Sequence, residues 1–344
     1  MADADSSAVN CGSNGRVDTY MGLRVASIFI IMAGSTFGAL FPVLARKSTW
    51  LHVPKSLFDF AKFFGSGVII ATAFIHLLAP GLEALSSECL SARWHDYPYA
   101  LALCMLSIFS IFIVELVAFR WGTQKLANIG KTHDAHGHDL GSHAAHGPEG
   151  VSESKTVEAS KSEASSDIEA ASPKHNHVFD HNVLTQVIGV GILEFGVVLH
   201  SVLIGLTLAV DQDFKVLFVV LVFHQTFEGL GIGSRLAYLE LPRQYYWLQI
   251  ASAVLFGMTT PIGIAAGLGV RTTYNPGSAT GSIVSGVMDS LSAGILIYTG
   301  LVELLAHEFL FNKEMLHASN SRLTYALCSM FLGCAVMALL GRWA

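Results

Sequence analysis

Long apolar runs recur throughout the sequence, and they constrain the fold more than any other feature. Each is about 20 residues or more, enough for an α-helix to cross a hydrocarbon core roughly 30 Å thick. The eight runs cover approximately residues 21–45, 63–81, 97–119, 183–210, 214–234, 245–270, 281–306 and 323–341. Only 13% of the residues are charged, against about 25% in average soluble proteins. The sequence therefore predicts an all-α membrane protein with eight transmembrane helices.

A polar segment divides these spans into three and five. Residues 120–182 are rich in Ser, Ala, Glu and His and contain few aromatic residues. Such a segment buries too little apolar area to fold alone, so we expect a disordered loop. The predicted organisation is an extracellular tail at 1–20, helices 1–3 within 21–119, a cytoplasmic His-rich loop at 120–182, and helices 4–8 within 183–344.

Basic residues in the connections predict the orientation of the chain. Lys and Arg gather in alternate loops: Arg46, Lys47, Lys55 and Lys62, then Arg120, Lys125 and Lys131, then Arg235 and Arg243, then Lys313 and Arg322. Basic loops stay preferentially on the cytoplasmic side. All four fall on that side if both termini lie outside. Cys11 and Cys89 then share the outer side, where a disulfide is permitted; spacing alone leaves their pairing open.

Two of the predicted spans resemble each other. Residues 67–79 (GVIIATAFIHLLA) align without gaps with residues 294–306 (GILIYTGLVELLA), which sets His76 opposite Glu303. In the predicted topology these spans run in opposite directions. The alignment therefore predicts an inverted repeat of helices 1–3 and 6–8. Inverted repeats are common in secondary transporters. Helices 4 and 5 would then lie between the repeats, in a three-plus-two-plus-three arrangement.

Ionisable residues inside the spans are the main functional signal. The set comprises Glu115, Glu194, Glu228, Asp289, Glu303, His76, His200 and His224. A charged residue at the centre of a membrane helix costs about 2.5–3.5 kcal/mol or more. Any one of them could be protonated or paired locally, but helix packing does not need so many. Together they predict a polar path through the bundle.

The strongest candidate site joins predicted helices 4 and 5. His224 and Glu228 are four residues apart and share one helical face, next to Gln225. His200 and Ser201 lie near the middle of the preceding span, and a very short connection makes the two helices antiparallel neighbours. Imidazole nitrogen and carboxylate oxygen suit zinc and similar divalent ions. The sequence thus predicts a metal site, with a purely structural His–Glu hydrogen bond as the alternative.

Two further groups extend this hypothesis. His76 near the outer end of helix 2, and Glu303, His307 and Glu308 at the inner end of helix 7, could form the mouth and exit of one path, or be merely solvated. The long loop carries clustered histidines at His133, His136, His138, His143 and His146. Histidine tracts in flexible segments bind metal weakly. We expect a metal-acceptor or sensing loop, with solvated low-complexity sequence as the alternative.

Taken together, these motifs resemble the Zrt/Irt-like (ZIP) family of metal transporters, and fungal zinc importers in particular. The segments that carry the resemblance are His200-Ser201 with Gly205, HQTFEG at 224–229, MTTPIG at 258–263, and DSLSAGILIYTGLVELLAHEF at 289–309.

The resemblance implies a central site with His200, Ser201, Gln225 and Glu228 as ligands and His224 adjacent. Some members have a second carboxylate one turn after the first His and bind two metals, whereas this chain has Ile204 there. The family also implies that His307 and Glu308 lie on the cytoplasmic exit, and a homodimer is one assembly that it implies.

The resulting hypothesis is uptake of Zn(II) into the cytoplasm, with zinc as transported substrate and no prosthetic group. The expected partners are divalent metal ions and the lipid bilayer, without nucleic acid. The expected location is the plasma membrane, with an internal membrane such as the vacuole as the alternative.

Three other functions share some of these sequence features with zinc uptake. A broader Fe(II)/Mn(II) importer and a metal sensor without transport would share the same buried ligands. An intramembrane metalloprotease would need HExxH. His307-Glu308 is followed by Phe309, Leu310 and Phe311, so we expect no enzyme.

Overall fold

The computed structural model describes residue 11 and residues 19–48, 53–128, 181–211, 213–239, 241–271 and 278–343. Within these residues the chain is helical, without strands, and eight helices are long and apolar enough to span a membrane. The elements are α1 (Met21–Lys47), α2 (Lys55–Ala71), the π-helix η1 (Thr72–Leu78), α3 (Ala79–Leu85), the short 3-10 turn η2 (Ala92–Trp94), α4 (Tyr99–Asn128), α5 (His181–Val210), α6 (Phe214–Tyr238), the 3-10 turn η3 (Arg243–Tyr245), α7 (Tyr246–Val270), α8 (Ala279–Tyr298), the π-helix η4 (Thr299–Phe311), α9 (Lys313–Leu316) and α10 (Asn320–Leu340).

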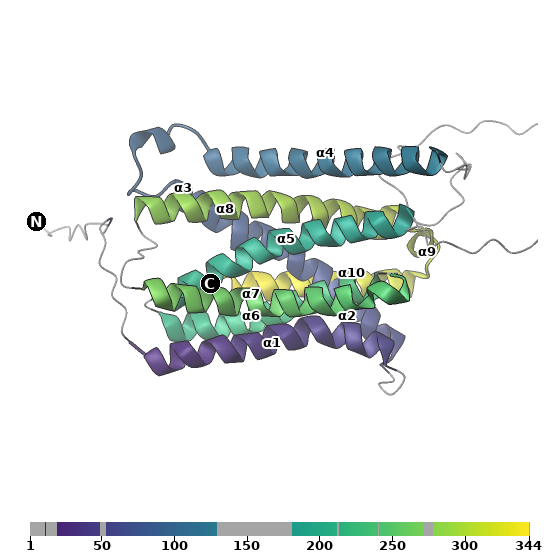
Figure 1. The fold of residues 1–344 in the computed structure, drawn as a ribbon, viewed down its shortest axis with the longest axis horizontal. Coiled ribbons are helices and arrows are strands. Elements are labelled where there is room, and N and C mark those ends of the chain that lie inside the picture. Colours follow the sequence, from purple (N-terminus) through teal and green to yellow (C-terminus); the bar gives the residue numbers. More distant parts are fainter. Residues whose placement is uncertain are drawn as a thin grey trace, which may run out of the picture.

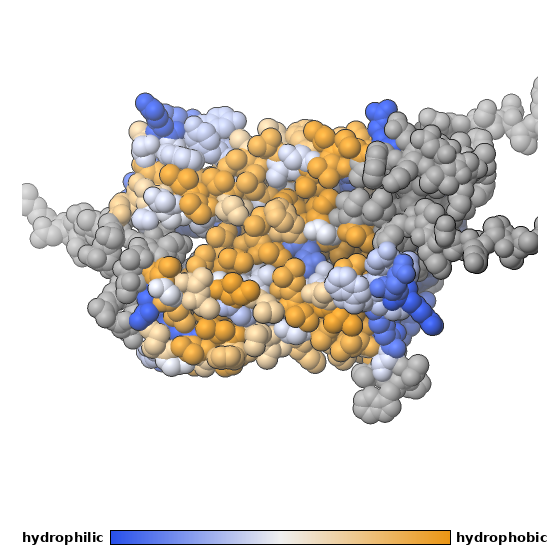
Figure 2. Space-filling view, in the orientation of Figure 1, coloured by the Kyte–Doolittle hydropathy of each residue, from blue (hydrophilic) through white to orange (hydrophobic). Residues whose placement is uncertain are grey.

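The prediction of an eight-helix membrane protein is confirmed, but two spans are longer than expected. The second runs over Lys55–Leu85 through α2, η1 and α3, and the seventh over Ala279–Phe311 through α8 and η4. The hydropathy pattern predicts too late a start for the second span, because the charged residues Lys55, Asp59 and Lys62 lie in its first turns. Large apolar side chains cover most of the visible surface between the ends of the bundle, as Figure 2 shows. Such a surface suits contact with lipid.

The helices run back and forth between two ends of one bundle (Figure 1). We call the end where α1 begins and α10 finishes the N-terminal end. The opposite end, where α4 finishes and α5 begins, is called the loop end. A disulfide joins Cys11 to Cys89, whose Cα atoms lie 5.4 Å apart. It ties the segment before α1 to the connection between α3 and α4 at the N-terminal end, so the two cysteines do pair.

Close packing fixes α5 against α7 beside the candidate site. A Cβ placed on Gly205 would lie 2.4 Å from the carbonyl oxygen of Thr260, and one on Gly263 would lie 2.3 Å from that of Val202. No side chain larger than hydrogen fits at either position without moving the backbone. Small residues allow membrane helices to approach this closely. Close packing matters there because the hydrophobic effect does not drive helices together within the lipid.

Both long spans contain a π-helical segment in their second half. η1 begins at Thr72 and η4 at Thr299, which are equivalent positions in the alignment of residues 67–79 with 294–306. π-Helical turns are rare and occur frequently at functional sites. His76 lies in the first segment and Glu303 in the second. The inverted repeat itself stays a prediction.

Candidate metal centre

Three ionisable side chains from two helices meet in the interior. His200 of α5 and His224 and Glu228 of α6 each offer a ligand atom, and these atoms lie within 4.8 Å of one another. His224 and Glu228 share a face of α6 because they are four residues apart. The short connection from Val210 to Phe214 brings α5 back beside α6. We call these three residues the central cluster.

The polar atoms of the central cluster are buried and largely without partners. His200, His224 and Glu228 expose 1%, 1% and 0% of their surfaces. Among the residues described, no hydrogen-bond partner reaches either ring nitrogen of His200, Nε2 of His224, either carboxylate oxygen of Glu228, or the hydroxyl of neighbouring Ser201. Leaving a buried polar group unpaired costs about 1–3 kcal/mol, and more if it is charged. A cation bound among these atoms would remove that cost, and their nitrogen and oxygen donors match zinc chemistry.

Gln225 orients His224. Its Oε1 lies 3.1 Å from His224 Nδ1, and its amide nitrogen donates to the Thr260 hydroxyl of α7. An amide oxygen only accepts hydrogen bonds, so His224 Nδ1 carries the proton and Nε2 keeps a lone pair for a metal. The resemblance implied Gln225 as ligand and His224 as neighbour; here His224 joins the cluster, and both amide atoms of Gln225 are engaged.

His76 lies beside the central cluster. Its ring centroid is 4.7 Å from that of His224, and its Nε2 is 3.0 Å from the Met337 carbonyl of α10. The sequence predicts His76 near the outer end of helix 2. Because the second span extends to Leu85, His76 lies deeper than expected and borders the site.

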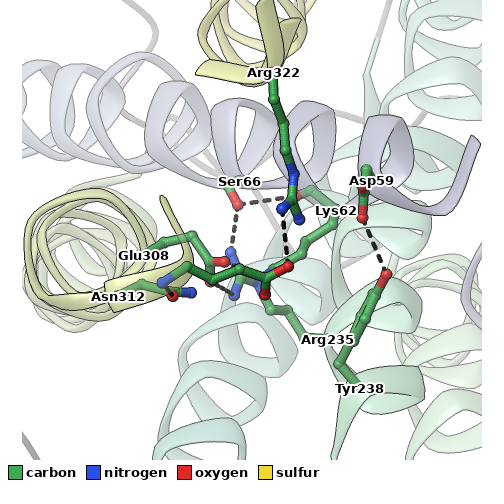
Figure 3. A network of polar contacts seen from close by, with 9 residues as sticks. Asp59, Lys62, Ser66, Arg235, Tyr238, Glu308, Asn312 and Arg322 are labelled. Carbon is green, nitrogen blue, oxygen red and sulfur yellow. Dashed lines mark hydrogen bonds and ion pairs between the residues drawn. The ribbon is translucent and has the colours of Figure 1, made fainter. Parts of the chain in front are cut away.

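A network of charges lies at the loop end, away from the central cluster. Glu308 of η4 forms ion pairs with Lys62 of α2 and with Arg235 of α6, whose Nη1 lies 3.5 Å from Glu308 Oε2. Arg235 also donates to Ser66 Oγ at 2.5 Å. Figure 3 shows these side chains converging from three helices, with Tyr238 and Asp59 alongside. We call Lys62, Ser66, Arg235 and Glu308 the charge network.

Sequence reasoning singled out Glu308 but missed its partners. From the sequence, Lys62 and Arg235 are expected only as orienting charges of cytoplasmic loops. The feature that could have identified them is their position. In the structure each lies within a membrane-spanning helix, where a charged side chain needs a partner.

The remaining intramembrane acids do not belong to the central cluster. Glu115 of α4 accepts a hydrogen bond from Tyr298 of α8 and also lies near Glu303 and His307 of η4. Glu194 of α5 accepts one from Ser252 of α7 at 2.5 Å. Asp289 of α8 accepts one from Ser285 at 3.0 Å. The loop histidines His133, His136, His138, His143 and His146 fall outside the residues that the structure describes.

Comparison with known proteins extends the resemblance over almost the whole chain. The family model "ZIP Zinc transporter" matches residues 21–341. The chain is 42% identical over 339 residues to Zinc-regulated transporter 1 of Saccharomyces cerevisiae, covering 94% of this chain and 88% of that protein. It is 34% identical over 421 residues to Zinc-regulated transporter 2 of the same yeast, covering 99% and 98%. It is also 33% identical over 331 residues to Fe(2+) transport protein 2 of Oryza sativa subsp. japonica, covering 94% and 86%. The chain therefore belongs to the ZIP family of zinc transporters, as a multi-pass membrane transporter and not an enzyme.

Proposed function

We propose that this chain carries Zn(II) into the cytoplasm by way of the central cluster. The observation that carries the proposal is the set of buried, unpartnered donor atoms on His200, His224 and Glu228. A structural His–Glu hydrogen bond would have left these atoms paired. Membership in a zinc transporter family supports zinc as the cargo.

Two features at the ends of the bundle support transport toward the cytoplasm. Disulfides form in oxidising compartments, so the Cys11–Cys89 bridge favours an outward-facing N-terminal end. Basic residues are concentrated at the loop end, as expected for the cytoplasmic side. The plasma membrane is the location that fits uptake, and both termini would then lie outside.

The described arrangement fits a state ready to receive zinc from outside. At the N-terminal end, Figure 2 shows the molecule hollowed between α8 and the layer of helices below it. At the loop end, the charge network joins α2, α6 and η4. Zinc would enter from the hollowed end, bind neutral imidazole and carboxylate, and leave once the charge network opens. Protons compete with metal for the same donor atoms, so ligand protonation would favour release.

Zinc uptake by cells that express defined variants tests the site. We expect His200→Ala and Glu228→Gln to lower the maximal rate of radiozinc uptake at least about tenfold, because each removes a ligand from a buried site. His317→Ala is the matched control, since His317 is exposed at the end of α9. Saturable uptake at the normal rate in both site variants, with normal amounts at the cell surface, would refute the proposal.

Two alternatives keep the same cluster but change its use. A relative named for Fe(2+) transport makes an Fe(II) or Mn(II) cargo a specific alternative, and donor type alone does not separate these ions. Competition of each metal against zinc uptake decides between them. A metal sensor would bind zinc without net flux in vesicles that contain the purified protein.

A further inference from the structure

Asp289 is a buried carboxylate outside the central cluster. It lies within α8, on the N-terminal side of the bundle's middle, and exposes 7% of its surface. The Ser285 hydroxyl, one turn earlier on α8, donates to its Oδ2 at 3.0 Å. Within the described part of the chain, no cation pairs with Asp289. An acid kept in a membrane helix without a cationic partner marks a functional site by default.

The helical face that carries Asp289 looks toward α5. Leu296, seven residues after Asp289, meets Gly196 of α5, where a Cβ would lie 2.4 Å from Leu296 Cδ1. Positions seven apart share a face, as does Ser292 between them. Ser292 is fully buried, and its hydroxyl has no hydrogen-bond partner among the residues with described side chains. Polar groups thus line the surface of α8 that faces the helix of His200.

The depth of Asp289 follows from this contact. α5 and α8 run in opposite directions (Figure 1), and Gly196 and Leu296 lie level. His200, four residues after Gly196, is then level with Ser292, four residues before Leu296. Asp289 lies three residues further toward the N-terminal end, about 4.5 Å at 1.5 Å per residue. It is therefore slightly less than one turn closer to the hollowed end than His200 of the central cluster.

We infer that Asp289, supported by Ser285, is a capture site that binds the incoming divalent cation before it reaches the central cluster. This inference rests on the proposed function, and it adds a residue on α8 to a site built from α5 and α6. Negative charge lining a cleft concentrates cations and raises their rate of arrival about 10- to 1,000-fold. Asp289 would determine the KM for zinc, and thus the uptake rate at low zinc concentration, whereas the central cluster would determine the maximal rate.

Radiozinc uptake over a range of zinc concentrations tests the inference. Asp289→Asn keeps the size of the side chain and its bond from Ser285 but removes the charge. We expect it to raise the KM for zinc about tenfold with a maximal rate within twofold of normal. Asp289→Glu keeps the charge, so its KM should stay close to that of the normal chain. The matched control is Asp213→Asn, an exposed acid at the same end of the bundle, which should leave the KM unchanged. An unchanged KM in Asp289→Asn would overturn the inference.

A second measurement does not depend on transport. Ser285→Cys, with Cys104, Cys328 and Cys334 replaced by Ala, sets a thiol beside Asp289. External Cd²⁺ should protect this thiol from a membrane-impermeant reagent, because thiolate and carboxylate would bind the ion together. Adding Asp289→Asn should weaken protection about tenfold. Equal protection with and without Asp289 would overturn the inference, whereas absent zinc flux with intact Asp289-dependent protection would refute the proposed function alone.

Discussion

The two ends of the bundle differ in how their polar groups are used. At the N-terminal end the surface is hollowed, and Asp289 has one serine as its hydrogen-bond partner. At the loop end Glu308 holds Lys62 and Arg235 together, so that α2, α6 and η4 are joined. Both ends carry buried acids, but among the described residues Glu308 has basic partners and Asp289 has none. Under the proposed function, this difference would let ions enter at the N-terminal end while the loop end stays closed.

Thiol accessibility gives the largest expected contrast between the ends. With the three free cysteines replaced, Ser285→Cys at the hollowed end and Ser66→Cys in the charge network form a matched pair. Thiol modification depends on access as well as on thiolate character. We expect an impermeant reagent added outside to modify Ser285→Cys at least about tenfold faster. Equal rates would show that the loop end is not closed.

The stability of the loop end should depend strongly on Glu308. Glu308→Gln leaves Lys62 and Arg235 without their shared carboxylate, and breaking a buried ion pair costs about 3–5 kcal/mol. We expect a clear fall in melting temperature in detergent, and faster modification of Ser66→Cys from the cytoplasmic side. Arg235→Gln should cost less, since Lys62 still pairs with Glu308. A melting temperature unaffected by Glu308→Gln would mean that the charge network does not hold these helices together.

Between the two ends, the orientation of His224 should have a moderate effect on zinc affinity. Gln225→Leu removes the acceptor that keeps the proton on His224 Nδ1. Loss of such an orienting partner typically costs 10- to 100-fold in metal affinity, so we expect at least about a tenfold rise in the KM for zinc. Thr260→Val, which spares the contact between Gln225 and His224, should have a smaller effect. Similar KM values for Gln225→Leu and the normal chain would exclude this positioning role.

The smallest effect is expected at the exposed ion pair between Glu314 and Arg322, whose atoms lie 2.8 Å apart. Exposed pairs contribute about 0–1 kcal/mol. Glu314→Gln is therefore the control for Glu308→Gln, with the same chemical change at the same end of the bundle. Its melting temperature and zinc uptake should match those of the normal chain. A large loss here would mean that any charge change at the loop end is disruptive.

Local sequence patterns were enough to predict the eight-span framework and the meeting of the three side chains of the central cluster. The apolar runs marked the eight spans. The spacing of His224 and Glu228, with the short turn before them, predicted that His200 would meet them. Each of these inferences uses residues close in sequence, or helices joined by a tight connection.

Contacts between distant segments were beyond sequence reasoning. The pairing of Lys62 and Arg235 with Glu308 joins three spans far apart in the chain, and no local pattern encodes it. The engagement of Gln225 depends on Thr260, 35 residues away on another helix. The disulfide between Cys11 and Cys89 spans 78 residues, and spacing left it open.

The π-helical segments affect how substitutions in the second and seventh spans should be read. A wheel drawn with α-helical periodicity from Lys55 to Leu85 loses its register at Thr72, because the i→i+5 turns of η1 add residues per turn. The same happens after Thr299. A residue beyond either point that looks lipid-facing on such a wheel can point into the protein. In mutational scans, each of these spans therefore needs one helical wheel for the residues before its threonine and a separate wheel for the residues after it.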